Sequence, residues 1–238
     1  MKWRVVEIEA RAAAFNMALD EAVIEHIARG ESPPTIRFYR WSPSAVSIGY
    51  FQSLNDEVNV EKCRELGVDV VRRITGGGAV YHDSDGEITY SVIAPEQLLP
   101  HGITESYRVI CGWITNSLAK LGVTAEFKPI NDIIINGKKV SGNAQTRRQG
   151  VVLQHGTILY DLDVRKMFSL LKVGQEKISD KFIQSVEERV TRVKNHCNSS
   201  FEEVYTALVE GFTEGKETEF DSWSESEFAR ASELFAKY

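Results

Sequence analysis

Hydrophobic and polar positions along this chain repeat with the helical period in some segments and with the two-residue period of strands in others. Between residues 15 and 29, apolar residues recur at Met17, Val23, Ile24 and Ile27 and Gly30 follows, which predicts an amphipathic helix. Similar helical patterns cover residues 57–66, 107–121, 164–171, 177–186, 201–214 and 224–237. Short alternating or apolar runs between turn residues predict strands at 3–8, 35–41, 45–51, 68–74, 87–94, 124–127, 132–135, 139–144 and 151–160.

This order of elements favours an α+β fold with a mostly antiparallel or mixed sheet flanked by helices. Helices stand at the start, middle and end of the chain, so the regular alternation of a doubly wound parallel sheet is missing. Asn136-Gly137 lies between two predicted strands and indicates a hairpin, because both central positions of the favoured turn need positive φ. A length of 238 residues fits one large domain.

Composition and charge exclude several classes of protein. The net charge of −6 provides no basic field for nucleic acid. No apolar run approaches the roughly 20 residues of a membrane span, and the N-terminus lacks the apolar core of a signal peptide. Cys63, Cys111 and Cys197 are too few and too widely spaced for a disulfide framework. We therefore expect a cytoplasmic protein with no nucleic-acid or membrane partner.

The most distinctive stretch runs from Arg72 to Asp83 and contains Gly76, Gly77 and Gly78 in a row. Successive glycines are conformationally costly and need a reason. One reason is a tight hairpin turn beside two solvated arginines; another is a cradle of backbone N–H groups for a phosphate. The spacing matches neither the P-loop nor the dinucleotide-binding motif. The glycines by themselves leave both alternatives open.

A second group of small and charged residues surrounds Lys139. Successive strand residues face opposite sides, so if Lys138 faces outward, Lys139 points inward together with Ser141. A buried lysine is expensive unless it meets an anion. The alternative is a hairpin tip exposed on both faces, which the pattern slightly favours. His82, Asp83 and His155 do not have the spacing of a zinc site.

The string from Arg72 to Asp83 closely resembles the lipoate–protein ligase A family. Further motifs match in order, from near the N-terminus to Thr191: residues 15–22, 47–52, 131–133, 139–144, 155–157 and 189–191. The resemblance implies a fold of the biotin/lipoate ligase catalytic-domain type. It also implies one catalytic domain over 1–238, with a ligase core of about 1–192, a helical segment of about 200–238, and no small accessory C-terminal domain. We expect either that the sequence is truncated before that domain or that a separate accessory protein supplies it.

The superfamily that this chain resembles also contains octanoyl and lipoyl transferases. In those transferases a nucleophilic cysteine is expected to hold the acyl group as a thioester. The cysteine of one branch falls in the region of Asn131-Asp132, and that of another branch falls at Leu153-Gln154; this chain has no cysteine at either place. Gly78 is similar to the ligases, whereas residues 144–147 and 152–156 are similar to the transferases. We expect a ligase. One alternative is an octanoyl or lipoyl transferase that takes the acyl group from an acyl carrier. The other is a non-catalytic protein that binds lipoyl domains or acyl-adenylate.

The resemblance implies ATP-dependent activation of lipoate, or octanoate, to an acyl-AMP with Mg²⁺. The acyl group then passes to a lysine of a lipoyl domain of a 2-oxoacid dehydrogenase complex or of the glycine-cleavage H protein. Lys139 is the expected catalytic residue, bridging the acyl carbonyl and the α-phosphate. Asp132 is a candidate Mg²⁺ or nucleotide ligand supported by Asn131. His155 and Gly156 are expected to line the acyl slot.

The same resemblance implies a set of substrate- and nucleotide-binding residues, in which Arg73 pairs with phosphate while Arg72 faces the other side of its strand. The full set is Arg73, Gly76, Gly77, Gly78, Ala79, Val80, Tyr81, Asn131, Asp132, Lys139, Ser141, Gly142, Ala144, His155, Gly156 and Thr157. Arg72, His82 and Asp83 are further candidates.

Overall fold

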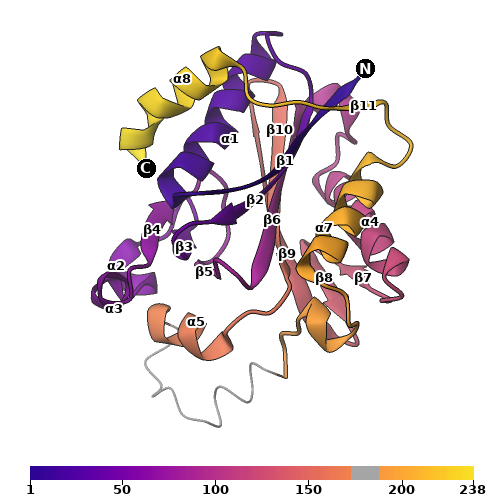
Figure 1. The fold of residues 1–238 in the computed structure, drawn as a ribbon. Coiled ribbons are helices and arrows are strands. Elements are labelled where there is room, and N and C mark those ends of the chain that lie inside the picture. The colour runs from indigo at the N-terminus through magenta and orange to yellow at the C-terminus, as the bar shows by residue number, and fades with distance from the viewer. Residues whose placement is uncertain (173–187) are drawn as a thin grey trace.

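The computed structural model describes residues 1–172 and 188–238, and these form two sheets with helices around them (Figure 1). The larger sheet has eight strands in the order β11-β1-β2-β6-β10-β9-β8-β7, and the smaller has three in the order β4-β3-β5. β1 runs parallel to β2 and β11, and the remaining neighbours of the larger sheet are antiparallel. The predicted α+β fold with a mixed sheet and flanking helices is confirmed.

The strands of the larger sheet are β1 (Trp3–Arg11), β2 (Thr35–Trp41), β6 (Glu87–Pro95), β7 (Glu126–Lys128), β8 (Asp132–Ile135), β9 (Lys138–Arg148), β10 (Val151–Leu159) and β11 (Thr218–Phe220). The smaller sheet consists of β3 (Ala45–Ile48), β4 (Asp69–Arg72) and β5 (Val80–His82). The α-helices are α1 (Ala13–Ala28), α2 (Leu54–Glu57), α3 (Val60–Glu65), α4 (Ile103–Lys120), α5 (Val164–Leu170), α7 (Phe201–Thr213) and α8 (Glu225–Leu234). Short 3-10 turns cover Glu96–Leu98, Val193–Asn195 and Phe235–Lys237.

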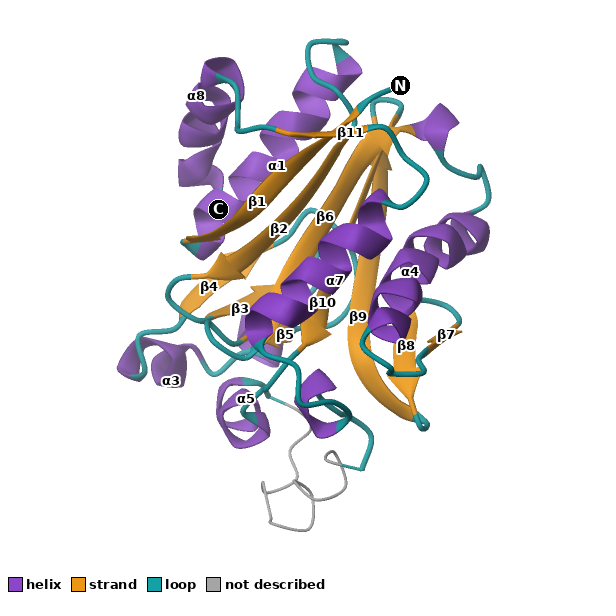
Figure 2. Cartoon of the chain, turned by 45° about the vertical axis from the view of Figure 1, so that its right-hand side comes forward, coloured by secondary structure: helices purple, strands orange, loops and turns teal. Residues whose placement is uncertain are grey.

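Two helix pairs cover opposite faces of the larger sheet. α4 and α7 pack together on one face, and α1 and α8 pack together on the other (Figures 1 and 2). The main hydrophobic core lies under α4 and α7, where alternate residues of the central strands, such as Phe38, Tyr90 and Ile158, are buried. The small sheet lies at the end of the α1 face, next to α2, α3 and α5 (Figure 1).

The opposite face of the same strands is unusually polar for buried surface. Arg37, Glu87, Ser91 and His155 alternate with the core residues of β2, β6 and β10, and each is at most 6% exposed. Since buried polar groups are expensive unless they are hydrogen-bonded, this face requires a network of partners. The functional site described below is built on this face.

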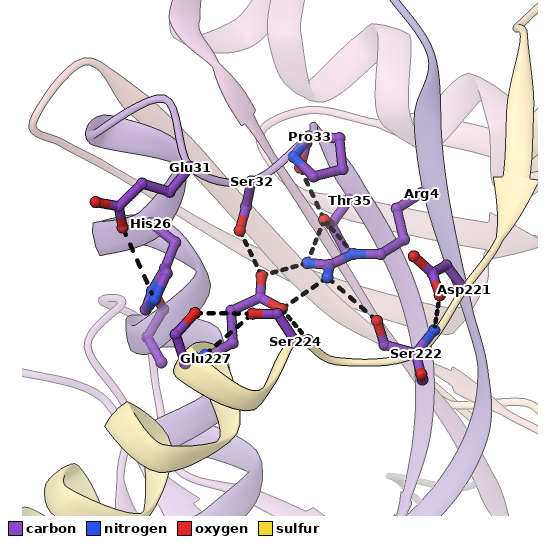
Figure 3. Close-up of polar contacts among 12 residues, drawn as sticks. Arg4, His26, Glu31, Ser32, Pro33, Thr35, Asp221, Ser222, Ser224 and Glu227 are labelled. Atoms are coloured by element: carbon purple, nitrogen blue, oxygen red, sulfur yellow. Dashed lines mark hydrogen bonds and ion pairs between the residues drawn. The ribbon is translucent and has the colours of Figure 1, made fainter.

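A buried ion pair fastens α8 to the first strand (Figure 3). The Arg4 guanidinium donates to both carboxylate oxygens of Glu227, at 2.7 and 2.5 Å. Glu227 is also the third residue of a capping box that starts α8 at Ser224, and its carboxylate accepts from Ser32. Although burial opposes the charged form, the hydrogen bonds and charge of Arg4 lower the pKa of Glu227 to about 2.

The structure changes several predicted boundaries. The strands β5 and β11 were not predicted, because each has only three residues and no alternation of its own. The predicted helix at 57–66 is two short helices, α2 and α3, and α4 begins four residues before the predicted position, at Ile103. β9 extends to Arg148, beyond the predicted end at residue 144. The predicted helix at 177–186 lies outside the described residues. None of the described helices has both the length and the apolar character needed to cross a membrane.

Candidate active site

A cavity of about 310 Å³ lies between the polar face of the larger sheet and the small sheet. Its floor comes from β2, β6, β9 and β10, its roof from β3, β5 and the glycine segment, and its end from α5. Most of the exposed lining is apolar, with contributions from Trp41, Leu159, Leu162, Met167 and Leu171. An apolar slot of this kind suits an alkyl chain, with polar groups at particular positions to orient it.

The glycine segment, Gly76 to Gly78, is held from below by Arg73. The guanidinium donates to the carbonyl oxygens of Gly76 and Gly78 at 2.8 and 2.7 Å, and to the backbone and hydroxyl oxygens of Ser47 at 3.1 Å. Arg73 is 6% exposed, and burial lowers its pKa to about 10, so it remains charged at neutral pH. These four contacts make Arg73 a brace for the roof of the cavity, and its pairing with phosphate stays a prediction.

Arg72 faces the other side of β4, as expected, and its guanidinium donates to the backbone of residues 49–52. Of the three glycines, only Gly77 has a positive φ, of 98°. A Cβ on Gly76 or Gly78 would meet nothing within 4 Å. The conformational demand for glycine therefore falls on Gly77 alone.

A chain of hydrogen bonds runs beneath the glycine segment from Ser47 to Glu87. His82 Nε2 lies 2.8 Å from the Ser47 hydroxyl, and His82 Nδ1 lies 2.7 Å from Glu87 Oε1. The ring of His82 stacks on Trp41 at a centroid distance of 4.0 Å, and the Trp41 indole donates to Glu87. The network fixes both rings in the cavity wall and links them through Ser47 to Arg73.

A second buried chain connects the glycine segment to α1. His155 Nε2 lies 2.7 Å from the Thr75 hydroxyl, and its Nδ1 lies 3.1 Å from Asp20, which pairs with Arg37. Burial lowers the pKa of His155 below its ordinary value, against the opposing effect of Asp20. His155 is thus uncharged at neutral pH and orients Thr75 at the start of the glycine segment.

Lys139 stands at the rim of the cavity, 2.7 Å from Asp132 Oδ1 across the β8–β9 pair. The contact is an ion pair without the alignment of a directed hydrogen bond. The Lys139 side chain is 41% exposed and lines the cavity, so it lies at the mouth of the slot, between the inward and the exposed positions that the pattern left open. The ammonium lies over Gly142, where even a Cβ would stand 2.7 Å from Nζ.

The expectation that Ser141 points the same way as Lys139 is wrong. A bulge in β9 pairs Lys139 with Ile134 and Ser141 with Ile133, and Val140 is the extra residue. Because Ile133 belongs to the main core, Ser141 faces that side. The alternation rule failed since it assumes an unbroken ladder, and nothing local to the sequence indicates the bulge.

Two asparagines lock the neighbouring backbone together. Asn131 and Asn143 exchange side-chain hydrogen bonds with each other's carbonyl oxygens, at 2.6 and 2.8 Å. Opposite them, a Cβ on Gly156 would stand 2.1 Å from Asn143 Oδ1. Glycine at 156 is therefore required by close packing of β10 against β9.

Most of the predicted site residues line this one cavity: Arg73, Gly77, Gly78, Ala79, Val80, Tyr81, His82, Asn131, Lys139, Gly142, Ala144, His155, Gly156 and Thr157. The structure does not place Gly76, Asp132, Ser141, Arg72 or Asp83 in its lining. Sequence reasoning missed the lining residues Tyr39, Trp41, Thr89, Leu159, Leu162, Met167 and Leu171, which belong to none of the matched motifs, and also Met17, which lies within the motif of residues 15–22. Their roles follow only from the pairing of distant strands.

No cysteine lies in the lining of the cavity. Cys63 and Cys111 are buried elsewhere, and Cys197 is half-buried just after the 3-10 turn Val193–Asn195. Burial raises the pKa of the Cys111 thiol to about 12. Among the described residues no group of three His, Cys, Asp or Glu side chains is arranged to hold a metal. Asp132 by itself provides one carboxylate for Mg²⁺, which commonly takes its other ligands from water and phosphate.

The fold and this apolar slot, with a lysine at its rim, define a catalytic domain of the lipoate ligase type. A family profile described as the lipoyl protein ligase A/B catalytic domain matches residues 12–213. The chain belongs to this family.

Similar curated proteins include the octanoyltransferases LipM of Kyrpidia tusciae and Brevibacillus brevis. They are 39% and 37% identical, over 99% and 98% of this chain and 96% and 94% of theirs.

Solved structures of similar proteins are described as lipoate protein ligases, not as octanoyltransferases. A bi-partite lipoate protein ligase from Thermoplasma acidophilum superposes with a TM-score of 0.88 at 35% identity, covering 100% of this chain and 93% of that one. A lipoate-protein ligase A bound with ATP superposes with a TM-score of 0.86 at 32% identity, covering 100% and 95%. The predicted family and fold type are thus confirmed, whereas the named relatives divide between transferases and ligases.

Proposed function

We propose that this chain transfers an octanoyl or lipoyl group to the ε-amino group of a lysine on an acceptor lipoyl domain. The observation that carries the proposal is the Lys139 ammonium at the rim of a mostly apolar slot. Such a slot holds an alkyl chain, and a cation at its mouth stabilises the negative charge that develops on an acyl carbonyl oxygen. Asp132 holds the ammonium in position.

In the reaction the acceptor amine attacks the acyl carbonyl carbon, an amide bond forms, and the bond to the leaving group breaks. The proton lost by the amine passes to the leaving group or to water. The protein contributes position and charge rather than a covalent step of its own. We propose the H protein of the glycine-cleavage system as a second acceptor for the same reaction.

An acyl thioester on a carrier protein is the first candidate donor. It is supported by the LipM octanoyltransferases, which match this chain over nearly their whole length. Because no cysteine lines the cavity, we propose direct transfer, with the carrier thiol as leaving group, in place of an acyl-cysteine intermediate.

ATP-dependent ligation is the second candidate, and the positions of the cysteines favour it. Here lipoate or octanoate attacks the α-phosphate, pyrophosphate leaves, and Lys139 lies between carbonyl and phosphate. Asp132 is the proposed ligand of the nucleotide or of Mg²⁺. The likeness to a ligase bound with ATP and to a bi-partite ligase supports this candidate, and the second likeness supports a separate accessory protein. We place either reaction in the cytoplasm, as three free cysteines support.

One experiment tests the proposal and separates the donors. The chain is incubated with an apo lipoyl domain and either octanoyl-acyl carrier protein, or lipoate or octanoate with ATP and Mg²⁺, and the mass of the acceptor is followed. Acylation from the carrier without ATP supports the first candidate, and AMP release with acylation supports the second. The ATP reaction is run with and without a candidate accessory protein. If no donor modifies the acceptor under any of these conditions, the proposed function is wrong.

A further inference from the structure

The segment of residues 49–52, which joins β3 to the small helix α2, holds two aromatic side chains out to solvent. Phe51 is 90% exposed, the largest exposure of any large hydrophobic side chain in the described ranges, and Tyr50 is 48% exposed. The two rings meet edge to face at a centroid distance of 5.0 Å. A phenylalanine side chain that is almost fully exposed contributes no buried apolar area to the stability of the fold. Its exposure therefore indicates a role in binding.

This segment is not a loose loop. The Arg72 guanidinium donates to the carbonyl oxygens of Gly49, Tyr50 and Gln52, at 3.0, 3.0 and 2.7 Å. The Gln52 side chain accepts from the Gly49 amide at 2.9 Å, and the Tyr50 amide donates to the Thr75 carbonyl at 2.9 Å. The fold therefore fixes the backbone that presents Phe51, and a fixed aromatic group loses little entropy on binding.

The aromatic pair lies beside the roof of the cavity. Thr75 immediately precedes the glycine segment, and the backbone of Gly49 packs against Gly77, which lines the cavity. A protein domain whose lysine reaches into the cavity covers a surface much wider than the opening, which can include the outer side of this roof. That surface is where Tyr50 and Phe51 stand.

Two arginines stand next to the pair. Arg148 lies over the ring of Tyr50 at 5.4 Å, and Arg72 lies beneath the segment. Neither arginine forms an ion pair with any residue of the described ranges, although the whole chain carries a net charge of −6. Aromatic and arginine side chains are those most enriched at the energetic centres of interfaces. Uncompensated positive charge around an apolar centre suits an acidic partner.

We propose that Tyr50, Phe51, Arg72 and Arg148 form the docking patch for the acceptor domain, which meets it with an acidic face beside its target lysine. The inference rests on the proposed function, in which the acceptor domain approaches the cavity with either acyl donor, whereas a carrier protein approaches it with only one of the two. Phe51 is the apolar anchor of the patch, and the arginines steer the acidic face toward it.

Phe51→Ser tests the patch, since it removes the anchor without touching a buried contact. Phe220→Ser is the matched control: Phe220 is 54% exposed on β11, at the far edge of the larger sheet. Steady-state transfer is measured to an apo lipoyl domain and, separately, to hydroxylamine, which is too small to need the patch. We expect kcat/KM for the domain to fall about tenfold or more in Phe51→Ser, with hydroxylamine and the control variant unchanged. Equal activity of wild type and Phe51→Ser toward the domain overturns the proposal.

Binding keeps this test separate from the proposed reaction. The dissociation constant of the apo lipoyl domain is measured by interferometry, whether or not any acyl transfer is seen. A rise of about tenfold in Phe51→Ser, together with weaker wild-type binding at high salt, supports the patch. An unchanged dissociation constant would overturn the proposal. Light scattering that shows wild-type dimers and Phe51→Ser monomers would also overturn it, because the patch would then be an interface between two copies of this chain.

Discussion

Gly49 and Gly77 are 28 positions apart in the chain, yet their backbones touch: a Cβ on Gly49 would stand 2.1 Å from the carbonyl oxygen of Gly77. This contact presses the start of the exposed aromatic segment against the roof of the cavity. The Thr75 carbonyl and the Arg72 guanidinium hold the same two segments together. The shape of the cavity therefore depends on a residue that does not itself line it.

Gly49→Ala is expected to destabilise the protein and to distort the cavity roof. A methyl group at 2.1 Å from a backbone oxygen forces the glycine segment to move, at a cost of about 1–3 kcal/mol. Urea unfolding measures the loss, and the KM for the acyl donor reports the distortion. Gly76→Ala is the matched control, because its Cβ would meet nothing within 4 Å. Equal losses in the two variants would contradict this account.

Lys139→Met is expected to lower kcat by about a hundredfold or more while leaving the fold intact. The variant keeps the length of the side chain but removes the charge that stabilises the carbonyl oxygen. Because the Lys139 side chain is 41% exposed at the rim, loss of its ammonium leaves no buried cavity. Transfer to the lipoyl domain and urea unfolding are measured together. Unchanged transfer would remove Lys139 from the proposed reaction.

Asp132→Asn tests whether the ion pair positions Lys139. The amide keeps the shape of the carboxylate but no longer attracts the ammonium 2.7 Å away. We expect a smaller fall in kcat than in Lys139→Met, and no further fall when the two substitutions are combined. Additive effects in the double variant would show that Asp132 acts independently, for example on the nucleotide or Mg²⁺.

Replacing all three cysteines is expected to leave acyl transfer within about twofold of wild type. None of the thiols lines the cavity, and burial raises the pKa of Cys63 and, to about 12, that of Cys111. A poorly ionised, buried thiol is a poor nucleophile. The variant Cys63→Ala, Cys111→Ala, Cys197→Ala is assayed with each acyl donor. Loss of transfer with a normal unfolding curve would point to a thioester intermediate after all.

The Arg4–Glu227 ion pair predicts a specific dependence of stability on pH. The pKa of Glu227 is about 2 in the folded protein and 4.5 ordinarily, so the folded state binds fewer protons between these values. Its contribution is complete above about pH 4.5 and is lost as pH falls toward 2. Glu227→Gln should reduce the free energy of unfolding by about 3 kcal/mol at pH 7, because Arg4 is left buried and unpaired.

Urea unfolding from pH 3 to pH 7 checks this prediction. The difference between wild type and Glu227→Gln should shrink as the pH falls below 4.5. A difference that stays constant over that range would mean that Glu227 stabilises α8 as a helix cap alone, without its charge. Glu225→Gln is a suitable control, because Glu225 lies on the same helix and is exposed.

Local sequence patterns were enough to predict most helices and strands, the α+β class and the family. The apolar period of residues 15–29 and the Asn136-Gly137 turn both act over a few residues. The motifs also identified most of the cavity lining before any strand pairing was known. Such information is local because backbone preference and side-chain period are local.

Tertiary structure decided which of those residues meet and what they do. The bulge at Val140 separates Ser141 from Lys139, and burial makes Arg73 a brace of the glycine segment. The pairing of β2, β6, β9 and β10 brings Trp41 and Gly156 to one cavity, and the brace on residues 49–52 leaves Phe51 in solvent. These outcomes depend on register and burial between segments distant in the chain, and no window of sequence contains both partners.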